Sequence, residues 1–455
     1  MVKHGLGNIL IQLSGIAIAV LFLLNCSEME TKWMRKFDAP GPGHYRINSI
    51  SCTKDEIYLT GTFRGESGGS KCFTARYDSD GALKWYYILQ TTEIENAQGM
   101  AVIAARTQQE LLTSRTDIYV LALAHDKDAH QRAILIKFDS LGNVQWQNTI
   151  TTHDGLLTSA LLSDFEGNIY VAGCERDKEN KPAIYIGKYD ESGKTLWFTK
   201  YYNELLDYEE IKFDIMQPGY IVTAGIMKNT GELFYMRYGS NGQFLGITDY
   251  NNNNAEFNLA GVEVGPEGNV YVTGTTVNSE TNSDFLTVAH DKDDNLLWAK
   301  QYDGAAHKND VAGTIAVDES LNVYVSGSSE SPKGVQGIVT VKYDKDGNIA
   351  WIATLEEKRP AEPIVMEPSY IHFGKKSEPV HFHIAGAIEN DAVIIRCNLN
   401  GFYSSYRKYG IGGKVTRPTA LSGTCMALEC VSEETSEARL VKFGTTTILG
   451  IARWD

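Results

Sequence analysis

The sequence predicts an all-β protein of about eight four-stranded sheets arranged as a β-propeller. Two observations lead to this fold: a strand pattern that recurs about every 50 residues, and a tryptophan at a fixed distance after a turn. Composition agrees, because 455 residues with 43% hydrophobic side chains can form a large core. Ring-shaped repeat folds place many residues in one unit, so this length does not require several domains.

The recurring strand pattern combines asparagine, β-branched residues, tyrosine and a closing glycine. It is clearest in Asn168–Gly173, Asn269–Gly274 and Asn322–Gly327, and weaker copies give eight centres near residues 61, 122, 173, 225, 274, 327, 386 and 428. Such short β-branched and aromatic runs are typical of strands. A further strand before each of these segments and two after it make units of four strands.

A turn with aspartate and glycine follows the strand, and a tryptophan follows the turn. Aspartate caps local amides and glycine accepts a positive φ, so the turn predicts a tight hairpin. We expect the tryptophan rings to pack between neighbouring sheets. Five aspartate-to-tryptophan intervals of seven residues occur: Asp78 to Trp85, Asp139 to Trp146, Asp190 to Trp197, Asp291 to Trp298 and Asp344 to Trp351.

Trp33 lies in an N-terminal segment that resembles the outer strand of a repeat, yet no inner strands precede it. This predicts that the N-terminal strand completes the last blade and closes the ring, which hides a sheet edge. Because Ile448–Trp454 also reads as an outer strand, the sequence holds one outer strand too many. Seven blades, or a five-stranded last blade, therefore remain alternatives to eight.

The first 25 residues read as an export signal. Lys3 precedes the apolar run Ile9–Leu24, which as a helix reaches roughly 24 Å, short of the roughly 30 Å hydrocarbon core. A permanent membrane-spanning helix is the alternative. We divide the chain into a signal peptide (1–25), a lipidated N-terminus with the closing strand (26–46) and the propeller (47–455).

Leu23–Ser27 resembles the lipobox of bacterial lipoproteins, although Asn25 is bulkier than the residue usual at its position. The resemblance implies acylation of Cys26, which would then be the mature N-terminus. Several acyl chains supply the two or more anchors that stable membrane attachment requires. Ser27 after the cysteine favours the outer membrane over the inner membrane in this family.

The combined pattern of strand, turn and Leu-Trp strand, clearest over residues 259–356, resembles the bacterial SBBP β-propeller repeat. Fainter similarities are to quinoprotein-type propellers, in which a docking tryptophan follows glycine by four residues, and to the propeller lipoprotein of the Bam complex. These resemblances imply an exported or surface-exposed propeller and no particular reaction. Fold alone does not supply a function.

The net charge and the absence of some motifs argue against several classes of function. The net charge of −15 argues against nucleic-acid binding. The sequence has no phosphate-binding loop or Cys-x-x-Cys motif. The sequence thus favours a non-catalytic envelope lipoprotein without cofactor whose propeller binds a protein or glycan partner. A glycan-processing or metal-dependent propeller enzyme with an unrecognised site is the alternative.

Two turns resemble the first half of a calcium loop, because oxygen ligands at alternate positions can converge on a cation. They contain Asp344, Asp346 and Asn348 in one copy and Asp291 and Asp293 in the other. Neither has the bidentate glutamate at the twelfth position, and turn formation explains the same residues. These five residues are weak metal candidates.

His381 and His383 alternate on one strand and could share a metal, but without a third ligand a structural role is favoured. The six cysteines after Cys26 lie mostly in apolar strand patterns and read as buried small residues. Cys52 with Cys72, and Cys425 with Cys430, are the sequence-local alternatives for a disulfide.

Overall fold

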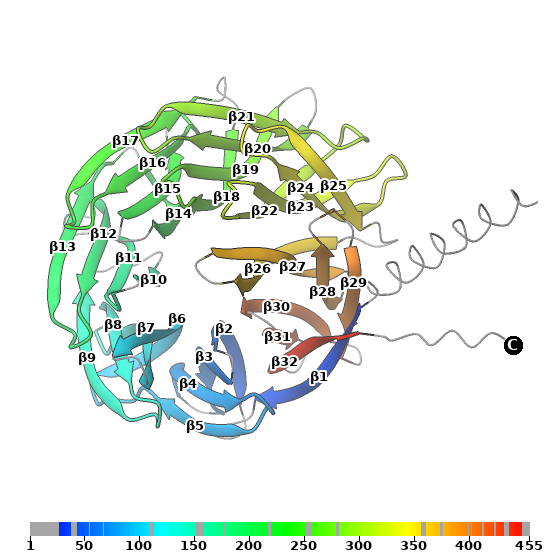
Figure 1. Ribbon diagram of the computed structural model, residues 1–455. Helices are drawn as coiled ribbons and strands as arrows, with labels where there is room; N and C mark the ends of the chain where they lie inside the picture. Colours follow the sequence, from blue (N-terminus) through cyan, green and yellow to red (C-terminus); the bar gives the residue numbers. More distant parts are fainter. Residues whose placement is uncertain are drawn as a thin grey trace, which may run out of the picture.

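The computed structural model is a ring of eight antiparallel sheets with four strands each (Figure 1). The all-β propeller prediction and the count of eight blades are confirmed, and the seven-bladed alternative is wrong. The structure describes most of residues 27–447. It leaves out 1–26, 448–455 and the positions 38–42, 54, 67, 110–112, 129, 152–158, 165, 177–178, 180, 205, 217–219, 229, 252–255, 279–281, 356–360, 374–375, 389, 399, 402, 412–413, 423–424 and 432–435.

In blades 1 to 4 the strands run in chain order from the innermost to the outermost. Blade 1 contains β2 (His44–Cys52), β3 (Glu56–Arg64), β4 (Lys71–Asp78) and β5 (Leu83–Ile88). Blade 2 contains β6 (Ile94–Gln109), β7 (Thr113–Asp126), β8 (Gln131–Phe138) and β9 (Val144–Thr151). Blade 3 contains β10 (Ser159–Ser163), β11 (Ile169–Arg176), β12 (Pro182–Tyr189) and β13 (Thr195–Tyr202). Blade 4 contains β14 (Leu206–Met216), β15 (Tyr220–Met227), β16 (Leu233–Tyr238) and β17 (Phe244–Tyr250).

Blades 5 to 7 follow the same order, and blade 8 joins the two ends of the chain. Blade 5 contains β18 (Glu256–Val264), β19 (Val270–Asn278), β20 (Asn282–His290) and β21 (Leu296–Tyr302). Blade 6 contains β22 (Asp310–Val317), β23 (Val323–Glu330), β24 (Gln336–Tyr343) and β25 (Ile349–Leu355). Blade 7 contains β26 (Ala361–Phe373), β27 (Lys376–Ile388), β28 (Asp391–Asn398) and β29 (Tyr403–Tyr409). Blade 8 contains β30 (Val415–Ser422), β31 (Cys425–Val431), β32 (Ser436–Thr447) and β1 (Ser27–Phe37).

The N-terminal strand closes the ring, as predicted. β1 pairs antiparallel with β32 from Phe37 opposite Ala438 to Ser27 opposite Thr447, and it is the outer strand of blade 8. Phe37 is 1% exposed and stacks on Phe73 of blade 1 with ring centroids 4.6 Å apart. The supposed surplus strand at 448–454 lies outside the described residues, and β1 occupies the outer position of blade 8.

The second strand of each blade is mostly buried, as is the third, because neighbouring blades cover both faces of these strands. The tyrosine of the second strand is fully buried in five blades: Tyr58, Tyr119, Tyr170, Tyr271 and Tyr324. Strands covered on both faces read as continuous apolar runs, which explains why this pattern was the strongest repeat signal in the sequence.

Each outer-strand tryptophan packs on the next blade rather than on its own turn. The indole Nε1–H donates to a carbonyl in the third hairpin turn of the following blade, as Trp85 does to Ser140 at 3.1 Å and Trp298 to Lys345 at 3.1 Å. The ring covers the turn glycine, and a Cβ on Gly142 or Gly347 would lie 2.6 or 2.7 Å from the indole. Four further contacts follow the same rule: Trp33 on Gly81, Trp146 on Gly193, Trp197 on Gly242 and Trp351 on Gly401.

Candidate functional site

The seam between blades 4 and 5 lacks the tryptophan that fills most described seams. In each Trp-bearing blade a basic or small residue of the third strand faces the tryptophan, as Lys188 faces Trp197. In blade 4 the corresponding pair is Arg237 and Gly246. A Cβ on Gly246 would meet nothing within 4 Å, so open space lies where six other blades place an indole.

A second small residue enlarges this space. Val222 lies three residues before Gly225, the position that Tyr170 holds before Gly173 in blade 3. A cavity of about 270 Å³ lies at this seam, and Val222 and Arg237, the cross-strand partner of Gly246, are in its wall. We call this cavity the open seam. Its walls are Tyr220, Ile221, Val222, Arg237, Leu245, Val264, Glu267, Gly268 and Lys292.

The hairpin turn of blade 5 beside the open seam also differs from the other copies of the repeat. Asp294, with φ +67°, replaces the glycine that lies under the indole at six other seams. Its Oδ1 accepts hydrogen bonds from Tyr235 Oη at 2.9 Å and from Arg237 Nε at 2.5 Å. The Arg237 guanidinium also donates to the carbonyls of Gly268 and Asp291, which fixes it in the cavity wall.

Apolar side chains at the mouth of the open seam remain in contact with solvent. Tyr220 is 42% exposed and Leu245 is 51% exposed, while Lys292 and Glu267 supply charge beside them. Small-molecule sites typically combine an apolar lining with a few fixed polar groups in roughly 300–1,000 Å³. The open seam has this composition and is slightly smaller.

A more open, polar pocket of about 300 Å³ lies beside the innermost strands of blades 1 and 2 and β31 of blade 8. Its basic groups are His44, Arg46 and Arg64, and Arg46 Nε lies 3.7 Å from Glu429 Oε2. The Asn48 side chain in this pocket donates to the Gly99 carbonyl at 2.8 Å. The pocket is wide and solvated, and an exposed ion pair of this kind contributes little to binding on its own.

The calcium-like turns predicted from the sequence have the hydrogen bonds of hairpin turns. Asp344 Oδ1 accepts from the backbone amides of Asp346 and Asn348, and its Oδ2 accepts from the Asn348 side chain. Asp291 makes the same three bonds with Asp293 and Asn295. These bonds lower the pKa of Asp344 and of Asp291. Asp346 and Asp293 pair with the adjacent lysines at the surface.

His383 is buried in blade 7, and its ring lies 4.9 Å from Phe443 in an edge-to-face contact. The side chain of His381 lies outside the described residues. The six described cysteines are free thiols, and burial raises the pKa of Cys72 to about 12. Cys425 and Cys430 lie five residues apart on one strand, about 16 Å, which is too far for a disulfide.

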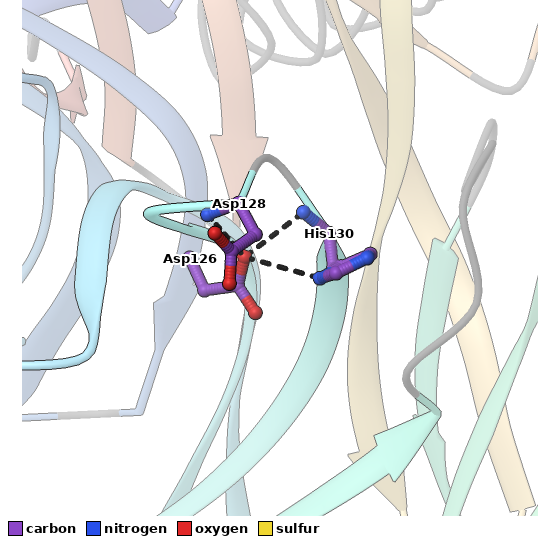
Figure 2. Close-up of side chains that lie close together, drawn as sticks. All are labelled: Asp126, Asp128 and His130. Carbon is purple, nitrogen blue, oxygen red and sulfur yellow. Dashed lines mark hydrogen bonds and ion pairs between the residues drawn. The ribbon is translucent and has the colours of Figure 1, made fainter.

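Asp126, Asp128 and His130 lie at the β7–β8 turn, where each offers a potential ligand atom for a metal (Figure 2). Asp126 Oδ1 accepts the backbone amides of Asp128 and His130, both at 3.0 Å, and Arg132 binds its Oδ2 at 2.9 Å. Burial opposes ionisation of Asp126, yet these hydrogen bonds outweigh it and lower its pKa. The carboxylate therefore caps the turn and pairs with an arginine.

The innermost strands β14 and β18 bring together Asp214 and Glu263. Burial raises the pKa of Asp214 to about 6 and that of Glu263 well above its usual range, and the Asp214 charge raises the latter further. Asp214 Oδ2 accepts the Val264 amide at 2.7 Å. In blade 1, Ser51 Oγ likewise accepts a hydrogen bond from the Ala104 amide at 3.0 Å. An acceptor at this position thus forms a hydrogen bond with the innermost strand of the next blade.

We expect stability to fall as pH rises through the range in which this pair ionises. The folded state holds a proton on Asp214 up to about pH 6, whereas the unfolded chain releases it near pH 4. Asp214→Ser keeps an acceptor, as in blade 1, and removes the carboxyl. Its melting temperature should therefore change less between pH 4 and 7 than that of the wild type. Equal pH dependence in the two proteins would contradict this account.

Comparisons with known proteins found solved structures that are similar only at low sequence identity. No family model matches the chain, and no curated protein matches its sequence. Similar solved structures include the β-propeller domain of the Trilobed protease from Pyrococcus furiosus, with 7% identity, a TM-score of 0.44, and coverage of 72% of this chain and 93% of that one. A puromycin hydrolase mutant has 12% identity and a TM-score of 0.44, and the match covers 85% of this chain and 58% of that one. The polysaccharide lyase Uly1 has 9% sequence identity and a TM-score of 0.41, and the match covers 74% of this chain and 89% of that one. Similarity at this level does not extend to function.

Within the described residues, no helix is long and apolar enough to cross a membrane. Cys26 and the preceding signal-like segment lie outside the described residues. The lipid anchor and the place in the envelope therefore stay predictions of the sequence.

Proposed function

We propose that this protein is a non-catalytic binding scaffold of the bacterial cell envelope, anchored by lipid on Cys26, that holds a partner at the open seam. The observation that carries the proposal is the cavity at the seam where Gly246 and Val222 replace the repeat's tryptophan and tyrosine. A rigid ring with an open intramolecular docking position can receive a side chain from outside.

The shape of the open seam favours a protein partner over a glycan. At five other described seams the equivalent space holds an indole whose Nε1–H donates to a turn carbonyl. The Lys292 carbonyl occupies that turn position at the open seam. Rigid aromatic side chains in pockets often dominate the energy of protein interfaces. We therefore propose that the partner inserts an aromatic side chain between blades 4 and 5.

Ligand-observed NMR with N-acetyl-L-tryptophanamide tests this proposal. A probe of this size should bind with a Kd of about 0.1–1 mM. A neutral oligosaccharide in a parallel titration tests the glycan alternative. Absence of indole binding at 10 mM probe, or binding of the oligosaccharide alone, would overturn the aromatic-anchor proposal.

A filled seam should gain stability and lose binding. The variant Gly246→Trp/Asp294→Gly restores both residues of a normal seam. Burial of the indole and relief of the positive φ at Asp294 should outweigh loss of the Arg237–Asp294 pair, and the free energy of unfolding should rise by about 1–2 kcal/mol. Gly246→Ala/Asp294→Gly is the matched control without a ring. Denaturant titration measures the change, and a variant less stable than this control would show that the cavity does not accept an indole.

The envelope part of the proposal rests on the lipobox-like sequence and on the SBBP resemblance. Mass spectrometry of the protein from its native membrane should find an acylated N-terminal peptide that begins at Cys26. The variant Cys26→Ala should lack this modification and leave the membrane fraction. An unmodified N-terminus elsewhere in the wild type would remove the anchor from the proposal and leave the binding site untouched.

A glycan-processing enzyme is the second candidate, because Asp214 and Glu263 form a carboxyl pair with raised pKa values. Many glycoside hydrolases use one protonated and one ionised carboxyl. Asp214, however, also has the structural acceptor role that Ser51 has in blade 1. Release of reducing ends from envelope polysaccharides by the wild type, and its loss in both Asp214→Asn and Glu263→Gln, would favour this candidate.

A further inference from the structure

A cluster of three aspartates lies at the junction of blades 5 and 6, away from the open seam. Asp284 lies near the start of β20, Asp303 directly follows β21, and Asp310 begins β22. Each offers one carboxylate oxygen, and the three oxygens lie within 4.8 Å of one another. Asp303 and Asp310 lie at the two ends of the connection between blades 5 and 6, and this connection brings them together.

The cluster is buried where charge is costly. Asp284 and Asp310 are 0% and 1% exposed, and Asp303 is partly exposed. The neighbours satisfy one oxygen each: Gly304 N donates to Asp310 Oδ2 at 2.5 Å, and the Gln301 amide donates to Asp284 Oδ2 at 2.6 Å. His307 Nδ1 contacts Asp303 Oδ2 at 2.5 Å and lies at the exposed surface.

The remaining oxygens of two aspartates have no protein donor. Asp310 Oδ1 and Asp303 Oδ1 are both inaccessible to solvent and make no hydrogen bond. Among the described residues, no lysine or arginine forms an ion pair with Asp303 or Asp310. A buried carboxylate oxygen without a partner usually indicates an ion or water that completes it.

The repeat shows that Asp310 is not required by the fold. Asp310 lies two residues before Ala312, which faces Gly327 of the next strand. The corresponding positions in blades 1 and 5 hold Tyr45 and Phe257, both buried. A buried carboxylate thus stands where other blades have an aromatic core residue. Burial raises the pKa of Asp310, against hydrogen bonds from Ser329 and Gly304, and the Asp284 and Asp303 charges raise it further.

We propose that Asp284, Asp303 and Asp310 bind a calcium ion that ties blade 5 to blade 6. Carboxylate oxygens are ligands for hard cations, and Ca²⁺ takes six to eight oxygens at about 2.4 Å, so that its ligands lie at most about 4.8 Å apart. The cluster meets that limit. Water and backbone carbonyls would supply the remaining ligands. This inference is independent of the proposed partner site, since the two sites share no residue.

The site differs from the other acidic groups of the chain. Asp126 has an arginine and two backbone amides on its carboxylate, and Asp344 has an asparagine side chain and two backbone amides. At the three-aspartate cluster, one carboxylate oxygen of Asp303 and one of Asp310 accept no hydrogen bond. Only this cluster combines burial, convergence and oxygens without donors among the acidic groups that the structure describes.

Calorimetry of the full chain tests the proposal. In 1 mM CaCl₂ the melting temperature should lie at least about 2 °C above that in EGTA, because an ion that binds only the folded state stabilises it by mass action. Isothermal titration should give one Ca²⁺ per chain. Asp303→Asn, at the partly exposed end of the connection, should abolish both effects, as should Asp310→Asn if it folds.

Asp126→Asn is the matched control, because it removes a carboxylate from the other three-residue acidic group and should keep the calcium response. A wild-type protein whose melting temperature is the same in calcium and in EGTA would overturn the proposal. So would a calcium response that persists in Asp303→Asn, or one that Asp126→Asn abolishes.

Discussion

Trp298→Ala should lower the free energy of unfolding by about 3–5 kcal/mol, the range for removing a large buried aromatic side chain. Trp298 is 7% exposed, lies 5.6 Å from the Tyr343 ring of the next blade and covers Gly347. Its Nε1–H also donates to the Lys345 carbonyl. Truncation removes these contacts at the seam between blades 5 and 6 together, and urea unfolding measures the loss.

Leu297→Ala is the control for this prediction. Leu297 is the preceding residue on β21 and is 46% exposed, so its truncation should cost less than about 1 kcal/mol. Similar losses for the two variants would mean that the tryptophans do not hold the seams, and the repeat would need another explanation.

Phe37→Ala should have an effect of similar size, about 3–5 kcal/mol, at the place where the ring closes. Phe37 joins blade 8 to blade 1 through its stack on Phe73 and an edge-to-face contact with Tyr45, with centroids 5.1 Å apart. Because β1 is the outer strand of blade 8, its release exposes the edge of β32.

Hydrogen exchange separates this closure from a general loss of stability. In Phe37→Ala the amides of β1 and β32 should exchange faster than those of blades 3 to 5. Lys36→Ala, which removes an exposed side chain from the same strand, should leave exchange unchanged. Uniform acceleration through all blades in Phe37→Ala would contradict local opening at the closure.

The fold was predictable because residues that are close together in the sequence determine its repeat pattern. The Asp-to-Trp interval is fixed by a hairpin turn, which depends on a few neighbouring residues. The second strand has a fully buried tyrosine in five of the eight blades. Blade number was harder to predict. Pairing of β1 with β32 joins residues more than 400 positions apart, and no local pattern reveals which of two candidate outer strands takes that place.

The sites were less predictable because they depend on departures from the repeat. Gly246 and Val222 are ordinary residues by themselves, and a search for chemical motifs passes over them. Alignment of the fourth copy with its neighbours would have shown the missing tryptophan and tyrosine. The sequence did mark Asp291 and Asp344, whose carboxylates turned out to cap hairpins.

The three-aspartate cluster was hidden for a different reason. Asp303 and Asp310 are near each other in the sequence, but Asp284 joins them only because β20 and β21 pair and the next blade begins beside them. No spacing rule predicts that arrangement. It becomes visible when burial and unsatisfied oxygens are known.

A crystal structure of the protein with N-acetyl-L-tryptophanamide would show whether the open seam binds an indole. We predict that the indole lies between blades 4 and 5, in contact with Tyr220, Leu245 and Arg237, with its N–H directed to the Lys292 carbonyl. A cavity that stays free of the probe at saturating concentration, or one closed by the side chains of Tyr220 and Leu245, would contradict the claim that the open seam is the binding site.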